Sequence, residues 1–277
     1  MINKVLVVAI LGSAALAARP DATAVSRGLV SRGLVSRGLV SRGLVSRGLV
    51  SRGPVMRTRA TWPVPVVAAE PAVTAAPRLT VARLQYEGGG DWYANPSSLP
   101  NLLRAIRERS AFAVEAAEAR VTLMDDRLWD YPFLHLTGHG NIVLSEPEVV
   151  RLREYLTRGG FLHADDNYGL DESFRREMKR VFPDRELVDV PLSHPVYHMV
   201  YEFPKGLPKV HEHDGKPARG YGLFIGNRLA VYYSYSSDLG NGWEDVGTYS
   251  DPAELHEAAL RMGVNLFVYA VTSRPSP

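Results

Sequence analysis

The chain of 277 residues contains no cysteine. Disulfide bonds, a thiol nucleophile and a lipid-anchored cysteine are therefore excluded. After the N-terminus, no apolar run approaches the ~18 residues that a membrane-spanning helix needs, so we expect no transmembrane segment in the mature chain. The G-x-S-x-G motif of serine hydrolases and the H-E-x-x-H motif of zinc peptidases are also absent. Histidine and carboxylate side chains remain as candidates for chemistry.

The first 17 residues have the pattern of a secretory signal peptide. Lys4 precedes an apolar run over residues 5–11, and small residues follow up to Ala17. The run is shorter than a spanning helix requires, which favours cleavage after Ala17 or Ala18 over a membrane anchor. We therefore expect an exported protein, either periplasmic or extracellular.

Residues 18–77 predict a disordered linker that carries a pentapeptide repeat. Val-Ser-Arg-Gly-Leu occurs five times in succession from Val25, and a sixth copy ends in Pro54. A period of five fits neither a helix nor a strand, and a Pro/Ala-rich stretch extends the linker. The repeat is either a tolerated expansion, which we favour, or a basic arm that contacts anionic polymers or membrane surfaces.

Positive charge is concentrated in this linker. The whole chain has 32 basic and 30 acidic residues, yet residues 18–60 hold nine arginines and one aspartate. With Lys4 also set aside, residues 61–277 carry a net charge of −7. A nucleic-acid-binding domain should present a basic face, so we expect no nucleic-acid partner.

Strand and helix signals alternate over residues 78–272, which predicts one α/β domain. Strands are expected at residues 79–86, 118–124, 133–140, 161–165 and 186–190, followed by a hairpin of 221–226 and 229–235. Helices are expected at 99–109, from a capping box at Ser145 to Gly159, around 174–181, and from a cap at Asp251 through Leu266. This order predicts a doubly wound, mostly parallel sheet with an antiparallel C-terminal edge.

Polar segments follow three of the predicted strands. GGGDW (88–92) follows the first strand, TGHGN (137–141) the third and HADDN (163–167) the fourth. Ligands of open α/β sheets bind at the carboxyl ends of the strands, so these segments predict a crevice there, although Gly, Asn and Asp also serve ordinary turns. The ligand-binding residues expected from them are Gly89, Asp91, Trp92, Gly138, His139, Gly140 and Asn167.

His163, Asp165 and Asp166 are the candidates for acid–base catalysis. His163 and Asp165 are two positions apart on a strand and should share a face. Paired carboxylates can separate their pKa values and so supply an acid and a base near neutral pH. A His/Asp-based hydrolase is therefore one hypothesis. The other, which we favour, is a binding module for a small polar, sugar-like ligand, with aromatic rings that stack on the sugar.

Polar clusters farther along the chain are expected to complete the crevice. They supply His194, His211, Asp238 and Trp243 as further ligand-binding candidates. His211 and His213 are also candidate ligands of a divalent metal, since Zn²⁺ and Mn²⁺ accept imidazole and carboxylate ligands. The H-x-H spacing is not specific, and isolated histidines more often bond backbone carbonyls, so metal binding stays an open alternative.

Several long motifs resemble the bacterial domain-of-unknown-function family 4159. They are EGGGDWYANPSSLPNLL, YPFLHLTGHGNIVLS, GGFLHADDNYGLDESFRREMKRVFP, HPVYH, PKVHEHDGKP and SDLGNGWED. The resemblance covers residues 78–272. The family name implies no activity.

The arrangement is also similar, more loosely, to the class I glutamine amidotransferase-like superfamily and its trehalose-utilisation-protein-like branch. That similarity implies a flavodoxin-like sheet, with FLHADD (161–166) at the turn where amidotransferases hold their nucleophile and TGHG (137–140) at the oxyanion-binding loop. Amidotransferase chemistry needs a cysteine activated by a histidine. Because this chain has no cysteine, glutaminase activity is excluded.

Overall fold

The structure, a computed structural model, describes residues 79–273. The predicted signal peptide (1–17) and the linker with its repeats (18–77) lie outside these residues. Within the described range, no helix combines the length and the apolar character needed to cross a membrane.

The described residues form an α/β domain whose elements follow the predicted order. The strands are β1 (Val81–Gln85), β2 (Ala119–Thr122), β3 (Phe133–Gly138), β4 (Phe161–Asp166), β5 (Val188–Asp189), β6 (Arg219–Ile225) and β7 (Arg228–Tyr235). The α-helices are α1 (Ser98–Arg109), α2 (Glu146–Thr157), α3 (Asp171–Val181), α4 (Leu239–Gly242) and α5 (Ala253–Thr272). Two 3₁₀ helices are η1 (Asp126–Asp130) and η2 (Pro195–Tyr197).

These strands form a single sheet in the order β2-β1-β3-β4-β7-β6-β5. Pairing is parallel from β2 to β7, and β6 is antiparallel to both of its neighbours. The predicted mostly parallel sheet with an antiparallel edge is therefore confirmed. The chain adds β2 on one side of β1 and β3 on the other, so the connections diverge between β1 and β3, where open sheets bind ligands.

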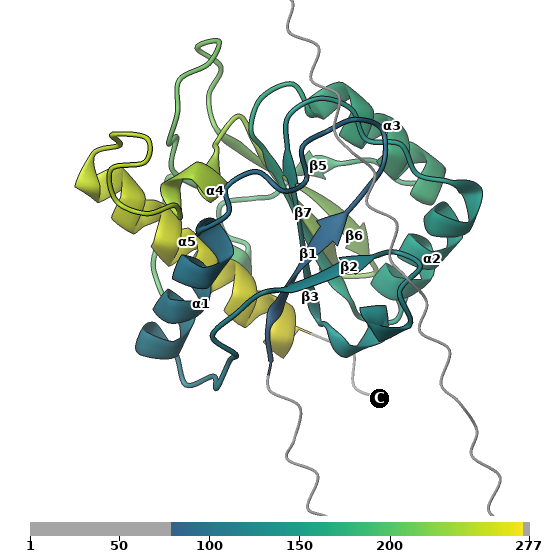
Figure 1. Ribbon diagram of the computed structural model, residues 1–277, viewed down its shortest axis with the longest axis horizontal. Helices are drawn as coiled ribbons and strands as arrows, with labels where there is room; N and C mark the ends of the chain where they lie inside the picture. Colours follow the sequence, from purple (N-terminus) through teal and green to yellow (C-terminus); the bar gives the residue numbers. More distant parts are fainter. Residues whose placement is uncertain (1–78, 274–277) are drawn as a thin grey trace, which may run out of the picture. The chain divides into compact units, whose positions relative to one another are not determined.

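Helices cover both faces of the sheet (Figure 1). One face packs under α1 and α5, and the other packs under α2 and α3. Strand residues alternate between the two cores: Phe133 and Phe161 belong to the α1/α5 side, while Leu134 and Leu162 belong to the α2/α3 side. The near-continuous apolar runs of β3 and β4 follow from burial on both faces.

Register aligns the polar residues of the strands into rows. His135 of β3 lies opposite His163 of β4, which lies opposite Tyr232 of β7. Two residues later, Thr137, Asp165 and Ser234 form the next row. Because the side-chain period of a strand is two, both rows face α1 and α5. His163 and Asp165 thus share a face, as the sequence predicts.

The start of α5 differs from the prediction. Its N-cap is Pro252, which has no side-chain cap hydrogen bond. Asp251, the expected cap, instead pairs with His211, whose Nε2 lies 2.8 Å from Asp251 Oδ1. The Asp251 carboxylate therefore binds the imidazole of His211, which is distant in sequence, and does not cap the N-terminus of α5.

Candidate functional site

Asp165 lies at the carboxyl end of β4 and is fully buried. It accepts hydrogen bonds from Ser234 Oγ (2.6 Å), Leu239 N (3.1 Å) and Gly240 N (2.6 Å). Burial, and next the nearby Asp238 carboxylate, raise the pKa of Asp165 to about 7. Through these hydrogen bonds, the buried side chain of Asp165 connects β4 to β7 and to the first turn of α4.

His163 is also fully buried and pairs with a second histidine. Its Nδ1 lies 3.1 Å from His135 Nδ1, and its Nε2 lies 2.9 Å from Ser234 Oγ. Burial lowers the pKa of His163 to about 3, and burial, His163 and Arg83 lower that of His135. Both rings are therefore neutral near pH 7. The chain of contacts His135–His163–Ser234–Asp165 lies between the sheet and the α1/α5 layer, where His163 is fully buried and out of direct reach of a ligand.

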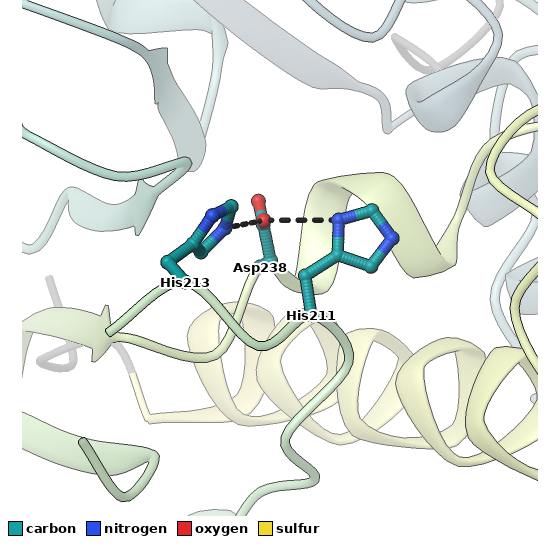
Figure 2. Close-up of side chains that lie close together, drawn as sticks. All are labelled: His211, His213 and Asp238. Carbon is teal, nitrogen blue, oxygen red and sulfur yellow. Dashed lines mark hydrogen bonds and ion pairs between the residues drawn. The ribbon is translucent and has the colours of Figure 1, made fainter. Parts of the chain in front are cut away.

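Asp238 forms the centre of a cluster nearer the surface, between two imidazoles (Figure 2). Its Oδ2 lies 2.6 Å from His213 Nε2 and 3.4 Å from His211 Nδ1. Asp238 is fully buried, whereas the side chains of His211 and His213 are 21% and 24% exposed. The hydrogen bond to Asp238 raises the pKa of His211, although burial opposes it.

Six buried polar side-chain atoms have no hydrogen-bond partner within the described residues, and four of them lie on loops or on α4 at this edge of the sheet. These four atoms are Asn95 Nδ2, Asn167 Nδ2, Asp238 Oδ1 and Asn241 Oδ1. Buried polar groups are normally paired. Four exceptions at one edge of the sheet mark this region as the candidate site.

Other atoms of the same residues are held in place. Thr137 Oγ1 donates to Asn167 Oδ1 (3.0 Å), and the Tyr249 hydroxyl donates to Asn95 Oδ1 (2.8 Å). The Asn241 amide lies 2.9 Å from His211 Nδ1. The unpartnered atoms therefore belong to side chains that are positioned, not mobile.

The glycine-bearing loops after β1 and β3 lie side by side. Gly90 N donates to Asn141 O (3.0 Å), and the Asp91 carboxylate accepts from His139 N and contacts its Nδ1. Gly138 has φ 139°, and a Cβ there would lie 2.5 Å from the Tyr86 hydroxyl. Only glycine permits this close approach. The loops thus bring Asp91 and His139 together at the β1/β3 divergence, with Gly89 and Gly140 exposed beside them.

Two hollows adjoin the Asp238 cluster. One, of about 330 Å³, is lined by Asp166, Tyr168, Asp214, Lys216 and Ser236 among others. Tyr168 stacks on the His213 ring with their centroids 4.9 Å apart. The other, of about 80 Å³, is lined by Asn241, Tyr249, Asp251 and His256 among others.

A larger hollow of about 690 Å³ between α2 and α3 is lined by Arg153 and Phe182 among others. None of its lining residues is among the unpartnered groups, so we assign it no role.

The structure places several predicted site residues elsewhere. Trp243 is fully buried in the α1/α5 core, where its Nε1 donates to Ala259 O (2.7 Å). His194 packs against Phe224 and Tyr269, beside the start of β7 and away from Asp238. Trp243 and His194 lie where they do because they pack against residues of α5 and β6. The spacing of residues in the sequence does not reveal these contacts.

Two more candidates have structural partners. Asp166 points to the α2/α3 side of β4 and accepts from Tyr168 N and Leu170 N at 3.1 Å each, which holds the turn before α3. Burial raises the pKa of Asp166. Trp92 is partly buried against the α2/α3 core, so only part of its ring is free for a ligand.

Sequence reasoning missed five residues at or beneath the site: Asn95, His135, Ser234, Asn241 and Tyr249. One signal was available for His135, because Phe-Leu-His occurs at 133–135 and again at 161–163. Adjacent parallel strands with the same tripeptide can align those histidines. The other four residues, on β7, on α4 and on loops, have hydrogen-bond partners more than 25 positions away.

The described domain is thus a doubly wound α/β domain with a candidate polar site at the carboxyl edge of its sheet. The family model described as domain of unknown function (DUF4159) matches residues 80–271, and the chain belongs to this family. A second model, the GLTT repeat, matches six copies over residues 25–53, which confirms the repeat. A comparison with curated proteins finds no significant match.

Proposed function

We propose that the carboxyl edge of the sheet binds a small polar, sugar-like ligand. The observation that carries this proposal is the group of four unpartnered buried atoms. An unsatisfied buried group costs about 1–3 kcal/mol, and proteins retain such costs mainly at functional sites. Two are amide donors and two are oxygen acceptors, and hydroxyl groups, which both donate and accept, can pair with either kind.

Aromatic rings at the rim support the same ligand class. Tyr168 and Tyr249 are 51% and 42% exposed, and tyrosine offers an apolar face together with a polar hydroxyl. The Tyr249 hydroxyl covers Asn95. Displacement of the segment 245–251, which includes the 87%-exposed Val246, would open the buried atoms to a ligand.

A thermal-shift screen of the full chain against mono- and disaccharides tests this proposal. A ligand at 100 times its Kd stabilises the folded state by about 2.7 kcal/mol, which raises the Tm by several degrees. Asn167→Ala should abolish the shift while changing the free energy of unfolding by less than about 1 kcal/mol, because losing the Thr137 hydrogen bond is offset by relief of the unpaired amide.

Asn227→Ala, at the turn between β6 and β7, is the matched control and should keep the full shift. If no saccharide stabilises the chain, or if the shift survives in Asn167→Ala, the proposal is wrong.

A hydrolase is the second candidate, favoured by the convergence of His211, His213 and Asp238. Its acid–base groups would be these residues, because His163 and Asp165 are completely buried. Release of nitrophenol from nitrophenyl glycosides or phosphates by the full chain, lost in Asp238→Asn, would support it. No release by the wild type would exclude hydrolysis of these substrates.

A further inference from the structure

We propose that His211, His213 and Asp238 bind one divalent transition-metal ion of the zinc class. Each residue offers one ligand atom, and these atoms lie within 4.8 Å of one another. A tetrahedral ion with bonds of about 2.1 Å separates its ligand atoms by roughly 3.4 Å. To close around a metal (Figure 2), His213 Nε2 and Asp238 Oδ2 would move apart from 2.6 Å, His211 Nδ1 already lies 3.4 Å from Oδ2, and no pair would have to approach from more than 4.8 Å.

The carboxylate of Asp238 provides an independent observation. Asp238 is 0% exposed, and its Oδ1 has no hydrogen-bond partner within the described residues. A buried carboxylate oxygen without a partner is costly, and buried charges are normally paired or coordinate metals. A cation coordinated by this carboxylate, through Oδ1 or through both oxygens, would remove this cost.

The surroundings of His211 favour the tautomer that binds a metal. Its Nε2 lies 2.8 Å from Asp251 Oδ1, and metal-bound histidines usually donate their other ring N–H to a carboxylate or a carbonyl. In this tautomer Nδ1 carries the lone pair and accepts from the Asn241 amide at 2.9 Å. Nδ1 also lies 3.4 Å from Asp238 Oδ2, so a cation coordinated by both atoms would replace the hydrogen bond from Asn241.

The backbone fixes Asp238 in an unusual conformation. Its φ of 66° and ψ of 45° lie in the left-handed region, where residues other than glycine are uncommon and often mark functional sites. The next two backbone amides bind Asp165, and Ser234, four residues earlier, does the same. Asp238 is therefore held between anchored residues, and Tyr168 fixes the His213 ring by stacking.

The ligand set of two imidazoles and one carboxylate determines which metal ion this site would prefer. This ligand set suits Zn²⁺ and related transition metals, whereas Mg²⁺ and Ca²⁺ prefer oxygen ligands. Three protein ligands leave a fourth position for water or a ligand hydroxyl, as in catalytic zinc sites. The metal site does not depend on the saccharide proposal and would be present in the resting protein.

Calorimetric titration of the EDTA-stripped full chain with ZnCl₂ and, separately, MgCl₂ tests the inference. We expect one Zn²⁺ per chain, bound at least 100-fold more tightly than Mg²⁺. The absence of cysteine in the whole chain removes thiolates as competing ligands. Asp238→Asn and His213→Gln should each weaken zinc binding at least 100-fold, and Asp251→Asn, which orients His211, should weaken it 10- to 100-fold.

His198→Gln is the matched control, because His198 also pairs with a carboxylate, Glu202, but belongs to no three-residue cluster among residues 79–273. This variant should bind zinc like the wild type. Circular dichroism checks that each variant is folded, and His213→Gln replaces Asp238→Asn if the latter unfolds. Absence of stoichiometric binding, or equal binding in both ligand variants, would overturn the inference and assign the cluster to an imidazolium–carboxylate pair. Saccharide shifts measured in EDTA would still report separately on ligand binding.

Discussion

At the scale of single residues, Arg83 shows how a buried charge positions the site. Its side chain is 1% exposed and forms two hydrogen bonds to Glu118, at 3.0 and 2.9 Å. It also donates to Ala94 O (2.8 Å) and Asn95 O (3.2 Å). Arg83 therefore links β1 to the loop that presents Asn95.

We expect Arg83→Met to lower the free energy of unfolding by about 3–5 kcal/mol, because it leaves the buried Glu118 without its main partner. Arg120→Met is the matched control: Arg120 contacts the same carboxylate at 2.9 Å but is 57% exposed. It should cost less than about 1 kcal/mol. Urea unfolding of both variants measures the difference, and equal losses would contradict this account of Glu118.

At the scale of elements, α1 is capped by a residue from a distant segment. Its N-cap, Ser97, makes no side-chain cap hydrogen bond. Instead, Glu244 Oε1 accepts from Ser97 N and Ser98 N at 2.9 Å each. A carboxylate also interacts favourably with the positive end of the helix dipole. Glu244, in a motif that the sequence associates with the site, therefore serves α1.

Truncation of this cap should give a graded loss of stability. Glu244→Ala removes the acceptor for one buried and one partly buried amide and should cost about 1.5–3 kcal/mol. Glu244→Gln keeps an oxygen but loses the charge, so it should cost less than the alanine variant. Chemical denaturation compares the two. A loss in Glu244→Gln equal to that in Glu244→Ala would mean that the charge, and not the acceptor, caps the helix.

At the scale of the whole molecule, the sheet interior holds two neutral histidines. In the folded state the pKa of His163 is lowered to about 3 and that of His135 is also lowered, while both are near 6.5 when unfolded. Below about pH 6.5 the unfolded chain therefore binds protons that the folded chain does not. Stability should be fully present above pH 6.5 and fall as the pH decreases. The raised pKa of Asp165 has the opposite effect and partly offsets the fall.

Removal of one histidine should flatten this dependence. Between pH 6.5 and 4.5, each histidine contributes up to about 1.4 kcal/mol per pH unit, and His135→Leu should reduce the slope by about that amount. The slope of the unfolding free energy against pH does not depend on a loss of stability that is the same at every pH. In His198→Gln the slope should not flatten, because Glu202 raises the pKa of His198 in the folded state. An unchanged slope in His135→Leu would show that the ring is protonated inside the fold.

Local patterns in the sequence predict most of the architecture. The capping box at Ser145 and the strand at 161–165 recur in the structure within a residue or two. The edge strand expected at 186–190 is reduced to two residues, because it pairs only with β6. The spacing of apolar residues predicts helices and strands well because it indicates which side of each element is buried.

The site is predicted less completely, because proximity across the sheet depends on strand order. The segments 137–141 and 163–167 could be assigned to the carboxyl edge because each contains the end of a predicted strand. Trp243 and His194 were expected there too, but apolar packing against α5 and β6 removes them. Asn95 and Asn241 carried no local signal.

The sequence by itself determined the order of the elements, the alternation that gives a doubly wound sheet, and the absence of thiol chemistry, because these follow from local composition and spacing. Only the tertiary structure decided which polar side chains are satisfied. Asp165, Asp166 and Glu244 pair with backbone amides, while Asp238 Oδ1 has no partner among the described residues. Hydrogen-bond satisfaction depends on distances between segments far apart in the chain, and those distances exist only once the sheet has formed.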